Sequence, residues 1–150
     1  MLRLDGFSST DVYRGCVVAI GNFDGVHRGH QVMLDRLKAY AAEHDAPAVV
    51  LTFNPHPIQL LRPEETPPPL STLDRKLELL DHYGVDVVIA YPTDRDLLNL
   101  SADEFFRRII LDQLSAIGMV EGPNFFFGKD RSGNVVRLAE LCKENSLFLE

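Results

Sequence analysis

The chain has 150 residues, of which 45% are hydrophobic and 25% charged, and its net charge is −7. This is the composition of a globular domain that is long enough to bury a core. The acidic balance argues against a general nucleic-acid-binding protein, and no apolar run approaches the roughly 20 residues that a membrane span needs. Residues 1–15 lack the apolar region of a secretion signal. We therefore expect one cytoplasmic domain, in which Cys16 and Cys142 are reduced thiols.

The first half of the chain predicts a strand–helix–strand unit. Residues 1–15 are mixed and polar and indicate only an edge strand or a lead-in, but the apolar run Val17–Ile20 predicts a strand buried on both faces. Helical spacing of apolar residues from about His30 through His44 predicts an amphipathic helix, and residues 48–53 predict a second buried strand. Such a unit has a right-handed crossover, so the sheet is expected to be parallel.

The second half continues the alternation of helices and strands. Residues 57–70 are rich in proline and lack periodicity, and we interpret the part 58–70 as either a lid or a passive surface crossing. The elements predicted after it are a helix following Ser71 or Thr72, a strand at 85–91, a helix opened by a capping box at 101–104, a strand at 116–120, a helix opened by Ser132 or Asn134, and the start of a strand at 147–150. The fold class predicted is α/β, with a Rossmann-like parallel sheet flanked by helices.

A glycine-rich stretch follows the first buried strand. Residues 21–31, GNFDGVHRGHQ, predict a loop that opens a helix, where backbone N–H groups can approach an anion, most often a phosphate. His27 and His30 share one face if both lie in the first helical turn. A zinc centre is disfavoured because the two cysteines offer no CxxC spacing. The histidines are then either ordinary surface residues or donors to a nucleotide's phosphates, which we prefer.

Two later segments follow predicted strands. Residues 54–57, Asn-Pro-His-Pro, come directly after the second buried strand, and their prolines should hold His56 on a rigid turn. Ligands of parallel sheets lie beyond the carboxyl ends of the strands, so this turn should lie beside the histidine loop. Residues 122–133, GPNFFFGKDRSG, follow a later strand. Because side chains alternate along a strand, at least one of the three phenylalanines must face a ligand or solvent.

These three segments resemble the bacterial FAD synthetase family, the FMN adenylyltransferase module that is usually fused to a riboflavin kinase. Their H-x-G-H core also resembles the HIGH motif of the wider nucleotidyltransferase superfamily. The resemblance covers nearly the whole chain, with departures at Asn54, Pro123 and Phe126. The family's next motif, I-S-S-T-x-x-R, does not occur within the 150 residues. The resemblance therefore implies an FAD synthetase domain over residues 1–150 that is incomplete at its C-terminal end, without the riboflavin kinase domain.

The resemblance implies a reaction and a set of site residues. The reaction is transfer of AMP from ATP to FMN, giving FAD and pyrophosphate, with Mg²⁺ carried by ATP and no protein residue named as a metal ligand. The catalytic donors would be His27 and His30. The implied ATP-binding residues are Gly21, Asn22, Phe23, Asp24, Gly25, His27, Gly29 and His30. The implied flavin-binding residues are Asn54, Pro55, His56, Pro57, Asn124, Phe125, Phe127 and Lys129.

Several alternatives stay open at this point. Asp24 is more typical of a turn than of a metal ligand, and Lys129 and Arg131 suit either a phosphate contact or a solvated turn. Phe125 or Phe127 could wall a slot for the flavin ring or belong to the core. Other functions are an adenylyltransferase for phosphopantetheine or nicotinamide mononucleotide, and a nucleotide- or flavin-binding fragment without turnover. Neither a nucleic acid nor a membrane is expected as a partner.

Overall fold

The computed structural model describes residues 1–7, 12–23, 28–54, 73–122 and 125–150. Several predicted site residues lie outside this description: Asp24, Gly25, His27, Pro55, His56, Pro57 and Asn124. The same holds for Pro123, for the predicted lid at 58–70, for the helix caps Ser71 and Thr72, and for the side chain of Asn54. The sequence-based expectations for these positions stay predictions.

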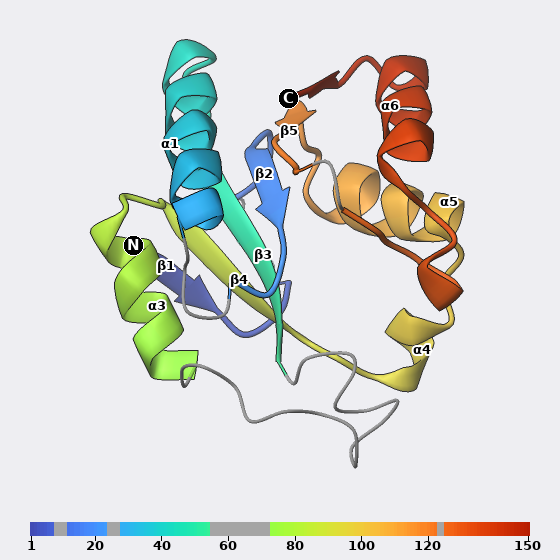
Figure 1. Cartoon of the computed structure of the whole chain (residues 1–150), viewed down its shortest axis with the longest axis horizontal. Coiled ribbons are helices and arrows are strands. Elements are labelled where there is room, and N and C mark those ends of the chain that lie inside the picture. Colours follow the sequence, from blue (N-terminus) through green and yellow to red (C-terminus); the bar gives the residue numbers. More distant parts are fainter. Residues whose placement is uncertain (8–11, 24–27, 55–72, 123–124) are drawn as a thin grey trace.

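Six parallel strands form a single sheet (Figure 1). The strands are β1 (Leu2–Leu4), β2 (Val17–Ile20), β3 (Ala48–Asn54), β4 (Val87–Pro92), β5 (Gly118–Met119) and β6 (Phe148–Leu149). Their order is β1-β4-β3-β2-β5-β6, and every neighbouring pair is parallel. The predicted Rossmann-like parallel sheet is therefore confirmed, with strand ends that differ from the predicted ones by a few residues.

The helices are those that the apolar periodicity predicts, apart from the short α4 and η3 and the π-helical geometry of η2. They are α1 (Arg28–Glu43), α3 (Leu73–His82), α4 (Arg95–Leu98), α5 (Ala102–Phe105), the π-helix η2 (Phe106–Gln113), the 3₁₀ turn η3 (Lys129–Arg131) and α6 (Val135–Glu144). The short α4 was not predicted because four residues are too few to show a helical period. The helix expected after Ser101 changes to π-helical geometry at Phe106, and the spacing of its apolar residues does not predict this change.

Side-chain caps confirm the predicted starts of two helices after β4. Ser101 Oγ accepts the Glu104 N–H at 3.1 Å, and Glu104 Oε1 accepts the Ser101 N–H at 3.2 Å, which completes the capping box. Asn134 Oδ1 accepts the Arg137 N–H at 3.0 Å, so Asn134, rather than Ser132, opens α6. In the part of the chain that the structure describes, no helix is both long and apolar enough to cross a membrane.

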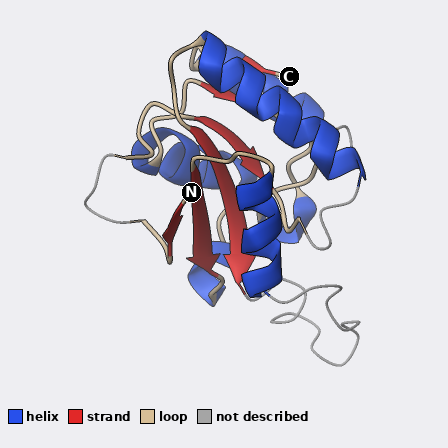
Figure 2. Cartoon of the chain, turned by 90° about the vertical axis from the view of Figure 1, so that its left-hand side faces the viewer, coloured by secondary structure: helices blue, strands red, loops and turns tan. Residues whose placement is uncertain are grey.

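The sheet is covered on both faces (Figures 1 and 2). Alternate residues of β2 show the division: Ala19 belongs to the apolar cluster shared with α1 and α3, whereas Ile20 belongs to the cluster shared with α4, α5, η2 and α6. All four residues of β2 are buried, as the continuous apolar run predicts. The core is thus two apolar layers, one on each side of the sheet.

The order of the strands creates a switch point beside β2. The chain leaves β2 through α1 to reach β3 on one side, and later, after β4, crosses to β5 on the other side. In open parallel sheets, the crevice beyond the carboxyl ends at such a point is where ligands bind. The segments that follow β2 and β5 both begin at this edge of the sheet.

Candidate functional site

The first residues after β2 remain hydrogen-bonded to β3. The Gly21 N–H donates to the Leu51 carbonyl oxygen at 3.1 Å, and Thr52 Oγ1 donates to the Asn22 carbonyl oxygen at 3.4 Å. Asn22 Oδ1 is buried and, within the described part of the chain, has no hydrogen-bond partner. The first two residues after β2 are therefore held at the carboxyl edge by strand-like contacts, with an amide oxygen enclosed beside them.

Phe23 turns the backbone and anchors it. Its φ is +52°, a left-handed conformation that few residues other than glycine adopt, and its side chain is only 1% exposed. The ring lies 4.9 Å, between centroids, from the ring of His30. A Cβ on Gly21 would come within 3.2 Å of the same ring. Phe23 thus joins the core under the loop and packs against the start of α1.

The N-terminus of α1 has the electrostatics of an anion site. The helix begins at Arg28 and carries no acidic residue in its first turn, and Gly29 and His30 are its next two residues. The first N–H groups of a helix lack partners within the helix, and its positive dipole end favours a negative ligand. His30 is half-buried, with its Nδ1 enclosed. A cationic or hydrogen-bonding side chain thus lies where the helix itself attracts an anion.

The three phenylalanines of the segment after β5 differ in exposure: Phe127 is buried, Phe125 is half-buried and Phe126 is exposed. Phe127 is buried in the core, 6.1 Å between centroids from Phe105, and the Phe125 ring stacks on it at 5.5 Å with an interplanar angle of 9°. Phe126 is 43% exposed and lies under the Arg131 guanidinium, 4.3 Å from ring centroid to Cζ. The predicted alternation is confirmed: Phe126 is the one that faces solvent, and the core interpretation holds for Phe127.

A close backbone contact fixes this segment against α5. Gly128 has φ +80°, and a Cβ there would lie 2.5 Å from the backbone nitrogen of Ala102. The next residue, Lys129, donates its N–H to the Leu100 carbonyl oxygen at 2.7 Å. Phe127 and Gly133 exchange two backbone hydrogen bonds, of 3.1 and 2.9 Å. The segment is therefore a closed turn that is held to the chain before α5, with the Lys129 side chain exposed.

Sequence reasoning assigned no role to Glu121, which lies at the switch point itself. Glu121 Oε1 accepts the Ile20 N–H at 2.6 Å, across from the end of β2. Burial raises the pKa of this carboxyl group well above its ordinary value, although the Ile20 hydrogen bond opposes the shift. The available signal was a carboxyl residue placed directly after the apolar run 116–120, where a buried strand should end in a turn residue.

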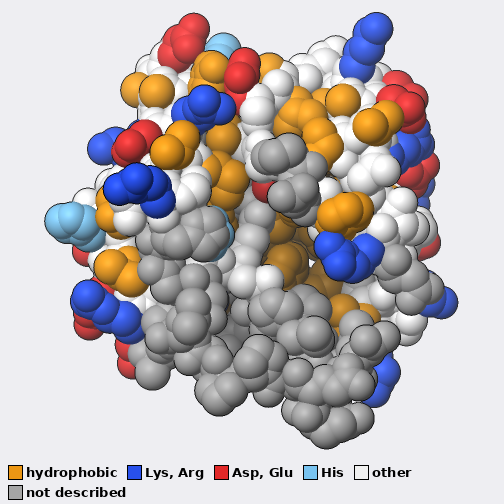
Figure 3. Space-filling view, in the orientation of Figure 1, with side chains coloured by type: hydrophobic (Ala, Val, Ile, Leu, Met, Phe, Trp, Pro, Cys, Tyr) orange, Lys and Arg blue, Asp and Glu red, His pale blue; other side chains and the backbone are white. Residues whose placement is uncertain are grey.

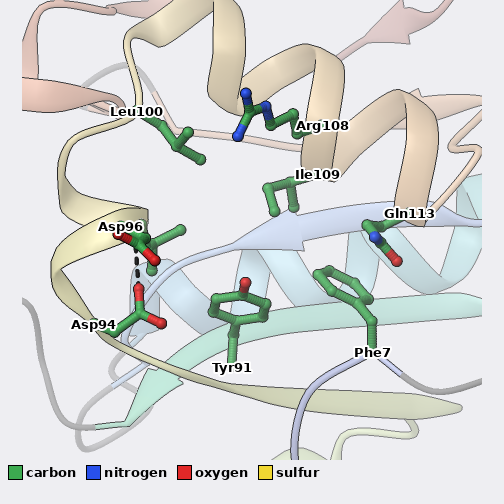
Figure 4. Close-up of a pocket in the computed structure, with 9 residues that line it drawn as sticks. Phe7, Tyr91, Asp94, Asp96, Leu100, Arg108, Ile109 and Gln113 are labelled. Atoms are coloured by element: carbon green, nitrogen blue, oxygen red, sulfur yellow. Dashed lines mark hydrogen bonds between the residues drawn. The ribbon is translucent and has the colours of Figure 1, made fainter.

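A pocket of about 250 Å³ lies elsewhere, at the end of β4 (Figure 4). It is lined by Phe7, Tyr91, Asp94, Asp96, Leu97, Leu100, Arg108, Ile109 and Gln113. Asp94 caps α4 by accepting the Leu97 N–H at 2.8 Å, which gives this carboxylate a structural role. None of the predicted site residues that the structure describes lines the pocket. Among the residues that the structure describes, no three His, Cys, Asp or Glu side chains are grouped to hold a metal ion.

The comparison with protein families decides the relationship of this chain. The model of the family described as FAD synthetase matches residues 9–150. The chain belongs to the FAD synthetase family. The resemblance carried by the three sequence segments is thereby confirmed.

Curated relatives of this chain carry a two-part name. A bifunctional riboflavin kinase/FMN adenylyltransferase of Pseudomonas fluorescens is 43% identical over 122 residues, which are 81% of this chain and 39% of the relative. The protein of the same name from Escherichia coli K12 is 36% identical over 130 residues, which are 87% of this chain and 42% of the relative. The chain thus spans about two fifths of the length of these relatives.

A solved structure has the same fold as this chain. A protein from Streptococcus pneumoniae, described as a macrolide-efflux protein, superposes with a TM-score of 0.77. The superposition covers 99% of this chain and 49% of the other, and the sequences are 23% identical. At that identity the match supports the fold alone, which agrees with the sheet order and layers described above.

The structure brings together only part of the predicted site. Gly21, Asn22, Phe23, Gly29 and His30 surround the turn from β2 into α1, whereas Phe125, Phe127 and Lys129 belong to the turn after β5. Asn54 ends β3, in register with Pro92 of β4. Figure 3 shows the surface hollowed between the half over α1 and the half over α6, with hydrophobic side chains in the hollow.

Proposed function

We propose that this chain is an FMN adenylyltransferase, which transfers AMP from ATP to FMN and releases FAD and pyrophosphate. The observation that carries the proposal is an anion-binding helix start, with His30 in its first turn, at the switch point of a chain that belongs to the FAD synthetase family. The names of the curated relatives support the same activity. We also propose that a riboflavin kinase accompanies this domain in the natural protein and that the reaction takes place in the cytoplasm.

The chemistry is a displacement at phosphorus. A phosphate oxygen of FMN attacks the α-phosphorus of ATP, a new P–O bond forms, and the bond to the bridging oxygen breaks as pyrophosphate leaves with the electron pair. The attacking group is already an anion, so no general base is required. Catalysis then depends on positioning and on donors that stabilise the charge that develops on the phosphates.

We assign the donor role to His30, together with His27 and the first N–H groups of α1. The anionic leaving group would lie at the positive end of the helix, where hydrogen bonds to charged oxygens are short and strong. Asn22 Oδ1, enclosed beside the loop, could accept from a hydroxyl or amino group of the nucleotide. Asn54, His56, Asn124, Phe125 and Lys129 are proposed to contact FMN. Among these, Phe125 is half-buried and stacks on Phe127, so its ring is suited to contact with the aromatic ring system of FMN.

Mg²⁺ is proposed to arrive with ATP. Mg²⁺ usually keeps several of its waters and binds substrate phosphates rather than a cage of protein ligands. When bound, the ion would neutralise phosphate charge. No residue of this chain is assigned as its ligand.

His30→Ala tests the proposal directly. We expect the variant to lose roughly a hundredfold or more in kcat, the scale for removing a donor that acts in the transition state. The assay is FMN fluorescence titration with and without MgATP, followed by chromatography for FAD. His82→Ala is the matched control, because His82 is an exposed histidine at the end of α3 and should leave the rate unchanged.

Each result of this assay has a distinct meaning. Formation of FAD by the wild-type chain supports the proposed reaction, and an unchanged kcat in His30→Ala would refute the donor role. Binding of FMN without formation of FAD would mark the chain as a binding fragment. Absence of flavin binding, combined with turnover of another phosphate substrate, would replace FMN by that substrate.

A further inference from the structure

The row of backbone hydrogen bonds between β2 and β5 ends with a hydrogen bond to a side chain, that of Glu121. The strands pair with Val17 opposite Gly118 and Val18 opposite Met119, and the Val120 N–H still donates to the Val18 carbonyl oxygen at 3.0 Å. The next N–H of β2 on this edge, that of Ile20, donates instead to Glu121 Oε1 at 2.6 Å. The carboxyl group therefore takes the place of a backbone carbonyl at the point where the two strands separate.

Glu121 is also fixed on its other side. Its N–H donates to the Glu150 carbonyl oxygen at 2.8 Å, which continues the pairing of β5 with β6. The residue is thus bonded to both neighbours of β5, through its side chain to β2 and through its backbone to the chain after β6. Gly21 follows Ile20 and Gly122 follows Glu121, so the hydrogen bond lies directly before both site segments.

In the described part of the chain, the two strands that flank the carboxyl group, β2 and β5, are apolar. Neither β2 nor β5 carries a titratable side chain, and the titratable group that faces Glu121 from α6 is Cys142. The pKa of the Glu121 carboxyl is raised by burial, and the pKa of the Cys142 thiol is raised to about 11 by burial and by the neighbouring Glu121. Neither group supplies a positive charge that would stabilise ionised Glu121.

We propose that Glu121 is a positioning residue of the anion site: its carboxyl group holds the end of β2 to the chain that leaves β5 and so sets the opening between Gly21–Phe23 and the aromatic segment. Burial favours the uncharged form of this carboxyl group, which would add no negative charge beside a polyanion. Ionisation would place a like charge next to the bound phosphates and weaken their binding. The identity of the anion as ATP rests on the proposed function. The hydrogen bond between Glu121 and Ile20 does not depend on it.

Two substitutions separate the hydrogen bond from the charge. Glu121→Gln keeps an oxygen that can accept the Ile20 N–H and never ionises. Glu121→Leu keeps comparable bulk but leaves the buried N–H without its acceptor. Glu43→Gln is the matched control, because it removes an exposed carboxylate from α1, away from the switch point.

The first measurement is the amide signal of Ile20 in ¹H–¹⁵N spectra of the whole chain, recorded from about pH 6 to about pH 10. In the wild type and in Glu43→Gln, this signal should move as Glu121 ionises, whereas in Glu121→Gln it should stay constant across the range. In Glu121→Leu, the amide signals of Gly21 and Phe23 should move as well. An Ile20 signal that ignores both pH and substitution would overturn the proposal.

The second measurement is the affinity for MgATP by calorimetry over the same pH range. Wild-type affinity should fall as the pH rises, Glu121→Gln should show a flat profile, and Glu121→Leu should bind about tenfold more weakly at every pH. A flat profile in the wild type would overturn the role of the uncharged form. If no variant binds ATP, the proposed function fails, and the Ile20 signal still decides whether Glu121 positions β2. If Glu121→Leu does not fold, the comparison of Glu121→Gln with the wild type decides.

Discussion

At the scale of single residues, the chain after β2 depends on a side chain that is buried in the core. Phe23 has a left-handed backbone and a fully buried ring that packs on His30. A ring in this place shapes the loop from below, since it fixes both the turn and the first turn of α1. The residue would therefore support the proposed anion site through its packing under the loop.

Phe23→Ala should lower the free energy of unfolding by about 3–5 kcal/mol, the range for removing a buried aromatic ring. Urea denaturation measures the change. Phe126→Ala is the control, because this phenylalanine is 43% exposed and its loss should change stability by only about 0.5 kcal/mol. Equal effects of the two substitutions would contradict the core position of Phe23.

At the scale of elements, one glycine determines how the aromatic segment meets α5. Gly128 combines a positive φ with a backbone contact that leaves no room for a Cβ beside Ala102. The turn it permits brings Phe127 onto Phe105 and the Lys129 N–H onto the Leu100 carbonyl oxygen. The capping box of Ser101 and Glu104 begins α5 in the same place.

Gly128→Ala should destabilise the chain by about 1–3 kcal/mol, because alanine is strained at this φ and its Cβ would push against α5. Gly122→Ala is a control of the same chemistry: a Cβ there meets nothing within 4 Å. Both variants are compared by urea denaturation and by the intensity of near-ultraviolet circular dichroism from the phenylalanines. A control that loses as much stability as Gly128→Ala would refute the close-contact argument.

At the scale of the whole molecule, the two thiols test the packing of one apolar layer, the one that the sheet shares with α4, α5, η2 and α6. Cys16 precedes β2 and Cys142 lies in α6, and both are free and buried, as predicted for reduced cysteines. Burial raises the pKa of Cys16 to about 12, and burial together with Glu121 raises that of Cys142 to about 11. Since the ordinary value is 9.0, the unfolded chain ionises first and stability should fall as the pH rises above about 9.

Alkylation of the native chain at about pH 8 should be roughly a hundredfold or more slower than alkylation in concentrated urea, because each unit of pKa lowers the thiolate fraction tenfold. Mass spectrometry of iodoacetamide-treated samples measures both rates. Cys142→Ala isolates the Cys16 signal. Rapid labelling of either thiol in the native chain would contradict the burial described for it.

The helices and strands of the second half show how far sequence patterns reach. Apolar runs and capping residues predict the parallel sheet, α3, α5 and α6, because each depends on contacts within a few residues. The short α4 and the π-helical geometry of η2 were not predicted, since both depend on how neighbouring elements pack. For the site, the sequence identified the loop after β2, the start of α1 and the aromatic segment after β5.

The sequence by itself determined the fold class, the family and the three segments in which site residues are predicted, since periodicity and motif are local properties of the chain. Only the tertiary structure decided which phenylalanine enters the core, and that Glu121 lies against Ile20 at the switch point. These outcomes depend on which strands become neighbours. The pairing of β2 with β5 joins residues about a hundred positions apart, and no local pattern encodes a contact between them.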